Sequence, residues 1–105
     1  MASDLTSVLA RRVMKWTSAP GRFLTGNRRW QPDWRFQPER NLNDAFRLLE
    51  AANPCEYAMG AKAGGEFWCW VNISGVVREA RDASMPRAIT YAVARAAGID
   101  VEAKH

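Results

Sequence analysis

The residues with the strongest chemical character lie together, in the stretch RRWQPDWRFQP at positions 28–38. Three aromatic rings and three arginines share this stretch. Arginine beside tryptophan can stack on nucleic-acid bases, can anchor a protein–protein contact, and can pin a loop to a core. We predict that a partner is bound by this stretch and the arginine before it, through Arg22, Arg28, Arg29, Trp30, Trp34 and Arg35. For the two tryptophans, docking to a partner and structural pinning remain open alternatives.

Residues suited to catalysis are sparse. The single histidine is the terminal His105, whereas acid–base or nucleophilic catalysis needs a base with an orienting partner. Cys55 or Cys69 with His105 would make a thiol catalyst or half a zinc site, but no residues have ligand spacing. We therefore expect a non-enzymatic protein with no metal site and no cofactor. We interpret the cysteines as small buried apolar residues in a reducing compartment, rather than as a disulfide.

Carboxylates and glycines have structural interpretations. The carboxylates stand at expected loop and cap positions, which favours solvated surface or helix capping for Asp33, Glu39, Asp44 and Glu50. The glycines within 60–65 lack the lysine, threonine and strand-to-helix context of a phosphate-binding loop. They predict a hairpin turn instead.

The net charge is positive and unevenly distributed. Fifteen Lys and Arg against eleven Asp and Glu give +4, and the excess is concentrated between Arg22 and Arg40. Such a surplus attracts phosphates or an acidic protein face, but it falls short of the dense basic face of a dedicated nucleic-acid binder. No apolar run approaches the roughly 20 residues of a membrane span, and the N-terminus does not resemble a secretion signal. We expect the protein in the cytoplasm of the host.

The pattern of apolar residues predicts one domain over 1–105, with frayed ends at 1–3 and 100–105. Helical periodicity predicts helices over about 4–15, from 42 to before Asn53-Pro54, and from about 85 to Gly98. Asn41 or Asn43 is expected to cap the second helix and Asp82 or Ser84 the third, and Gly98 followed by Ile99 resembles a Schellman stop. Between the first two helices, 17–40 contains five glycines and prolines that break regular structure, and it is predicted to be a long Arg/Trp-rich loop.

Three strands are expected after the second helix, over 55–59, 66–73 and 76–80. If the first hairpin closes symmetrically about its turn, Cys55 and Tyr57 share a face with Trp68 and Trp70, and the opposite face is also apolar. Exposed, the two tryptophans would form a stacking platform for bases, but with three helices to place we favour a covered core. The sequence thus predicts an α+β fold: a short three-stranded antiparallel sheet covered by helices on both faces, in the order α-loop-α-β-β-β-α.

Four short motifs carry a resemblance to a known family: Phe36-Gln37-Pro38, Asp44-Ala45-Phe46 with Glu50, Phe67-Trp68-Cys69-Trp70, and Pro86-Arg87-Ala88-Ile89. Over about residues 5–98 the chain resembles the phage ABA sandwich domain family, which includes the NinX-like proteins of lambdoid phages. The resemblance implies a small phage or prophage protein with helices on both faces of a short antiparallel sheet. It implies no catalytic residue, because the matching positions are structural. Phe36-Gln37-Pro38, where the resemblance begins, is expected to fasten the loop to the core. The arginine-rich stretch 22–35 and the turn 60–65 are particular to this chain.

These observations lead to two hypotheses about function. The first is a non-enzymatic phage or prophage accessory protein that binds and inhibits a host protein complex, with a bacterial defence system such as a CRISPR-Cas effector as the expected target. The positive charge argues against an inhibitor that mimics DNA. The alternative is a binder of nucleic acid or nucleotides that uses the same residues, either on its own or as a sponge for a signalling nucleotide. Monomer and homodimer both remain open.

Overall fold

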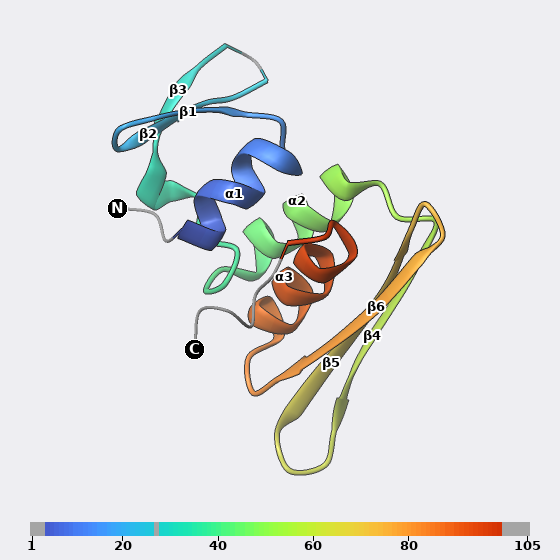
Figure 1. Ribbon diagram of the computed structural model, residues 1–105. Coiled ribbons are helices and arrows are strands. Elements are labelled where there is room, and N and C mark those ends of the chain that lie inside the picture. The colour runs from blue at the N-terminus through green and yellow to red at the C-terminus, as the bar shows by residue number, and fades with distance from the viewer. Residues whose placement is uncertain (1–3, 27, 100–105) are drawn as a thin grey trace.

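The computed structural model describes residues 4–26 and 28–99; the ends predicted to be frayed, 1–3 and 100–105, lie outside these residues. The chain forms three helices and two antiparallel sheets (Figure 1). The helices are α1 (Asp4–Arg12), α2 (Leu42–Ala52) and α3 (Met85–Ala96). The small sheet comprises β1 (Thr17–Ala19), β2 (Arg22–Leu24) and β3 (Trp30–Pro32), followed by the 3-10 helix η1 (Asp33–Arg35). The main sheet comprises β4 (Glu56–Lys62), β5 (Glu66–Ile73) and β6 (Val76–Asp82). Within residues 4–26 and 28–99, no helix has the length and apolarity that a membrane crossing requires.

The predicted α+β class and the three-stranded antiparallel sheet between the second and third helices are confirmed. The register of the first hairpin differs from the symmetric one that we expected. Lys62 lies opposite Glu66 across a three-residue loop, in which Gly64 and Gly65 both have positive φ, +96° and +87°. Because side chains alternate along a strand, this loop length places Tyr57 on the face of Val71 rather than on the face of the tryptophans.

The helices lie on one side of the main sheet (Figure 1). Helix α3 packs directly on β5 and β6, and α2 packs on α3. Nearly every side of α3 is buried, because its alanines allow neighbours to approach closely from two directions. The expectation of a helix on the second face of the sheet was therefore wrong: within the described residues the other helices lie on the α3 side of the sheet, and none covers that face.

The predicted long loop 17–40 was wrong in part, since it contains the small sheet and η1. The chain breakers lie mainly between strands: Gly21, with φ +74°, is in the turn between β1 and β2, and Gly26 is in the turn before β3. Three rings hold this sheet on the core. Trp16 packs against Phe23 and Phe36 at centroid distances of 5.9 and 5.0 Å, and all three rings are buried. Aromatic clusters of this kind add geometry-specific attraction to the burial of their area.

Helix α2 begins and helix α3 ends at predicted capping residues, whereas Ser84, the N-cap residue of α3, makes no side-chain capping bond. The Oδ1 atom of Asn41 accepts a hydrogen bond from the Asp44 amide at 3.1 Å at the start of α2, as expected of an N-cap. At the end of α3, Gly98 has φ +79°, and the Ile99 amide donates to the Ala94 carbonyl at 2.8 Å. This is the predicted Schellman motif, and the buried Ile99 side chain makes its apolar contact.

Candidate partner-binding surface

The outer face of the small sheet carries the first exposed tryptophan. Trp30 lies opposite Leu24 in the β2–β3 pairing, and Arg22, two residues earlier on β2, projects from the same face. The Arg22 guanidinium carbon lies 4.1 Å from the centroid of the Trp30 ring, within the range of a cation–π contact. The ring is nevertheless 47% exposed. The structure thus places Trp30 outward, beside an arginine, and not in the core.

Trp34 is the second exposed ring, 57% accessible to solvent. It lies in η1, with the Arg35 guanidinium carbon 5.4 Å from its centroid. Its backbone is held in place, because its carbonyl accepts a hydrogen bond from Gln37 Nε2 at 2.6 Å. The Asp33 amide next to it donates to the Gly21 carbonyl at 3.0 Å. An exposed aromatic side chain is therefore presented from a backbone that is already ordered, which reduces the entropy lost on binding.

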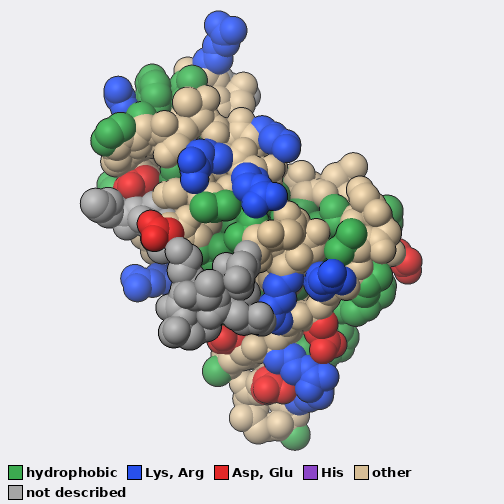
Figure 2. Space-filling model, viewed as in Figure 1, with side chains coloured by type: hydrophobic (Ala, Val, Ile, Leu, Met, Phe, Trp, Pro, Cys, Tyr) green, Lys and Arg blue, Asp and Glu red, His purple; other side chains and the backbone are tan. Residues whose placement is uncertain are grey.

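Arg28 and Arg29 lie in the turn between β2 and β3, and both are exposed. The Arg28 amide donates to the Thr25 carbonyl, and the Thr25 amide donates to the Arg29 carbonyl, each at 2.9 Å. Arg28 adopts φ +60°, a left-handed conformation that is uncommon for a residue with a side chain. The structure brings the six predicted residues to one end of the molecule, where basic and hydrophobic side chains gather over the small sheet (Figure 2). We call these six residues the Arg/Trp surface.

Residues 36–39 fasten this end to the helical core, as expected for Phe36-Gln37-Pro38. Phe36 and Pro38 are fully buried. The Pro38 carbonyl accepts a hydrogen bond from the buried Thr90 hydroxyl of α3 at 2.9 Å. The Glu39 carboxylate accepts one from the Tyr91 hydroxyl at 2.8 Å. The Arg/Trp surface is consequently coupled to α3 through backbone and side-chain bonds.

Asp44 and Asp33 were predicted to be solvated or to cap a helix; both are only 7% exposed, and they stand in the first turns of α2 and η1. Asp44 Oδ2 accepts a hydrogen bond from the Gln37 amide at 2.9 Å, and its Oδ1 lies 3.5 Å from Arg47 Nη1. The burial of these two carboxylates leaves the surrounding arginines to dominate the surface. Between positions 11 and 47 the chain has nine Lys and Arg against three Asp and Glu, or +6, so the rest of the chain carries −2 of the total +4.

A pocket of about 400 Å³ lies beside the small sheet. It is lined by Ser7 of α1, by residues of the β1–β2 hairpin, and by Asp33 of η1. The sequence did not indicate it, because its walls come from three elements that are separate in the chain.

The two cysteines are both free thiols with different surroundings. Cys69 is buried under α3, and burial raises its pKa from 9.0 to about 11. Cys55 is exposed, so its predicted burial was wrong. Cys69 lies opposite Met59, four residues along from Cys55, a separation too long for a disulfide. Within residues 4–26 and 28–99, no three His, Cys, Asp or Glu side chains gather as metal ligands do.

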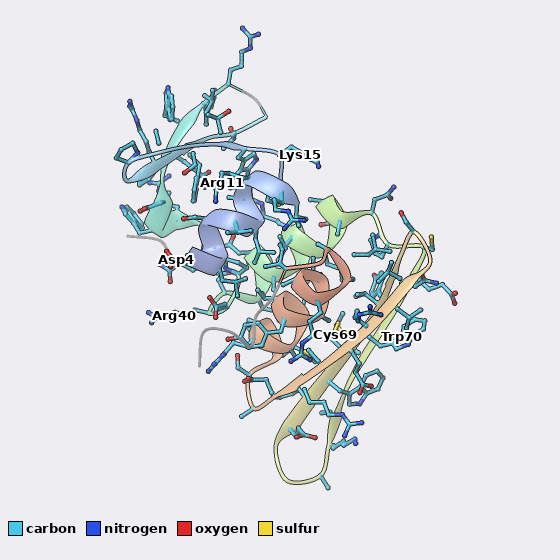
Figure 3. The ribbon with its side chains drawn as sticks, in the orientation of Figure 1. Asp4, Arg11, Lys15, Arg40, Cys69 and Trp70 are labelled. Carbon is cyan, nitrogen blue, oxygen red and sulfur yellow. The ribbon has the colours of Figure 1, made fainter. Side chains whose placement is uncertain are left out.

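Trp68 and Trp70 lie on the uncovered face of the main sheet, so our expectation of a helix over them was wrong. Figure 3 shows Cys69 directed toward α3 and Trp70 on the opposite side of the sheet. The Trp68 ring covers Gly60, where an added Cβ would come within 2.8 Å of the indole. A sequence signal for this arrangement was present: the residues opposite the two tryptophans on β4 are the small Ala58 and Gly60.

Comparison with known proteins adds a likeness of fold. A 2.0 Å crystal structure of a phage protein from Bacillus cereus ATCC 14579 superposes with a TM-score of 0.75 at 14% sequence identity, covering 94% of this chain and 89% of that chain. The chain thus has the fold of a phage protein. No protein-family model matches the chain, so membership of the phage ABA sandwich family stays a prediction. No curated protein matches its sequence.

Proposed function

We propose that this protein is a non-enzymatic phage or prophage accessory protein that acts in the host cytoplasm by binding and inhibiting a host protein complex. The observation that carries this role is the Arg/Trp surface: Trp30 and Trp34 are 47% and 57% exposed, and each ring has an arginine beside it. Tryptophan and arginine are the residue types most enriched at the energetic centres of protein interfaces. A bacterial defence complex of the CRISPR-Cas kind is the expected target.

The chemistry of the surface favours an acidic partner. The stretch 11–47 carries +6 by sequence, and two of its three carboxylates, Asp33 and Asp44, are buried. Exposed arginines such as Arg28 and Arg29 can form paired hydrogen bonds with carboxylates. The rings would then supply the apolar anchors, and the charges would steer the approach of the partner.

A pull-down from nuclease-treated host lysate tests this role. Tagged wild-type protein is expected to recover a defined host protein complex, and the double variant Trp30→Ala, Arg29→Ala is expected to lose it. Truncation of an interface anchor typically costs about 2 kcal/mol or more, roughly a thirtyfold loss of affinity. The matched control is Tyr57→Ala with Arg78→Ala, which removes an exposed ring and an exposed arginine from the main sheet. Recovery of the partner by the Trp30/Arg29 variant would refute the assignment of the surface.

Binding of nucleic acid or nucleotides is the second candidate. It is favoured by one observation, the guanidinium of Arg22 stacked at 4.1 Å on a half-exposed indole, because the same pair can sandwich a base. Affinity for nucleic acid falls steeply as salt rises, in proportion to the phosphates that the protein neutralises. A protein that purifies without excess absorbance at 260 nm and does not shift DNA or RNA at low salt excludes this candidate.

A further inference from the structure

From the uncovered face of the main sheet we infer a second site of association, at which two copies of this chain pack sheet against sheet. This face is formed by alternate residues of the three strands and is distinct from the Arg/Trp surface. Its apolar centre consists of Trp68 and Trp70 on β5, with Ala58 and Gly60 beside them on β4 and Val77 on β6. Both tryptophans are partly buried, and neither packs against the core of the domain, so the exposed part of each ring is available to a partner.

The charges of this face argue against a nucleic acid as its natural occupant. Three carboxylates, Glu56, Glu66 and Glu79, share it with two cations, Lys62 and Arg81, which gives −1. A stacking platform for bases needs a positive groove along the phosphate backbone. The basic half of the molecule lies around the small sheet, at the other end (Figures 1 and 2). Arg81 and Glu79 already form an ion pair within the chain, Nε to Oε1 at 3.2 Å, so the face presents both signs of charge side by side, and a second copy presents the same two signs in return.

The strand register makes the face complementary to itself. We consider a two-fold axis that lies between the sheets, perpendicular to β5, and passes beside Cys69. It sets Trp68 over Trp70 of the second copy. Trp68 lies opposite Arg81 and Trp70 lies opposite Glu79, so the same axis sets Arg81 over Glu79 of the second copy.

On β4 the same axis has the same effect. Lys62 lies opposite Glu66, at one end of β5, and Glu56 lies opposite Asn72, at the other end. The rotation therefore places Lys62 over Glu56 of the second copy. The small residues Gly60 and Ala58 also face each other and leave room for the four indoles. Every cation on the face thus meets a carboxylate, whereas the alternative axis, parallel to the strands, would place β4 over β6 and lose these pairings.

The extent of the face fits a dimer that dissociates readily. Strand β5 has eight residues; at about 3.3 Å each, with three strands about 4.8 Å apart, the face measures roughly 26 by 14 Å. Two such faces with their side chains bury on the order of 1,000 Å² in total, the lower limit for a specific interface. The dimer would carry two Arg/Trp surfaces, which would raise the avidity for any partner with paired sites.

Sedimentation velocity of the full chain, from micromolar to millimolar concentration, tests this inference. Wild type is expected to pass from monomer to dimer as concentration rises. Arg81→Glu sets like charges face to face, at Glu79 of the second copy, and is expected to raise the dissociation constant about tenfold or more. The double variant Glu79→Arg, Arg81→Glu exchanges the two signs and is expected to restore the dimer. Far-UV circular dichroism establishes that each variant is folded.

Three results would overturn the inference: a wild-type protein that is monomeric throughout, an Arg81→Glu variant that still dimerises like wild type, or a charge-exchanged variant that stays monomeric. Trp70→Ser gives a second arm that does not depend on charge, and it is expected to abolish dimerisation. Retention of the dimer by this variant would place the contact elsewhere.

Discussion

The hydrogen bond from Thr90 to the Pro38 carbonyl gives a direct test of how the Arg/Trp surface is fastened to the core. Thr90 is fully buried in α3, and its hydroxyl lies 2.9 Å from the carbonyl oxygen. Replacement of Thr90 by valine keeps the β-branched shape but removes the side-chain hydroxyl, so the buried Pro38 carbonyl loses this donor. A buried polar group left unpaired costs about 1–3 kcal/mol. We expect Thr90→Val to lower the free energy of unfolding by this amount.

The measurement is equilibrium denaturation in urea, with thermal unfolding alongside. In a domain of this size each kcal/mol lowers the Tm by about 4–8 °C. The matched control is Thr25→Val, since the Thr25 hydroxyl makes an exposed bond to the Arg29 carbonyl at 3.2 Å, which water can replace. The control is expected to change stability by less than about 0.5 kcal/mol. If Thr90→Val is as stable as wild type, or no less stable than the control, then the Pro38 bond does not hold residues 36–39 as argued.

Three further experiments test local features of the chain. Lys15 follows α1 with φ +63° and an exposed side chain. Lys15→Gly is therefore expected to stabilise the protein by up to about 1 kcal/mol in urea denaturation, whereas Lys15→Ala should not. Equal stability of the glycine variant and wild type would show that this conformation is unstrained. Cys55 is expected to react with a thiol reagent in the native protein while the buried Cys69 reacts only after denaturation, and equal labelling of both would contradict the burial under α3. Burial raises the pKa of the Cys69 thiol to about 11 in the folded protein, against 9.0 when it is exposed. The stability that comes from burying this thiol in its neutral form is therefore complete below pH 9 and is lost as the pH rises from 9 to about 11. Cys69→Ala should remove this part of the pH dependence, which denaturation across that pH range measures.

Local features of the fold were predictable because their causes lie within a few residues. The caps at Asn41 and Gly98, the periodic apolar stripes of the helices and the role of Phe36-Gln37-Pro38 each depend on neighbours that the sequence places together. The loop predicted at 17–40 failed for a related reason. Its strands have three residues each, too few for a periodic pattern, and they depend on the distant rings of Trp16 and Phe36 for support.

The sequence by itself determined the α+β class, the order of the helices and the main strands, and the concentration of arginine and tryptophan between positions 22 and 35. Periodicity and composition are local properties, and local interactions preserve them on folding. Only the tertiary structure decided which rings are buried. Trp16 is enclosed by two phenylalanines, Trp30 lies outward beneath Arg22, and Trp70 lies on a face that no helix of the described chain covers (Figure 3). An indole can pack in a core, against an arginine or against a partner, so its position depends on which surfaces the packing of α3 leaves free.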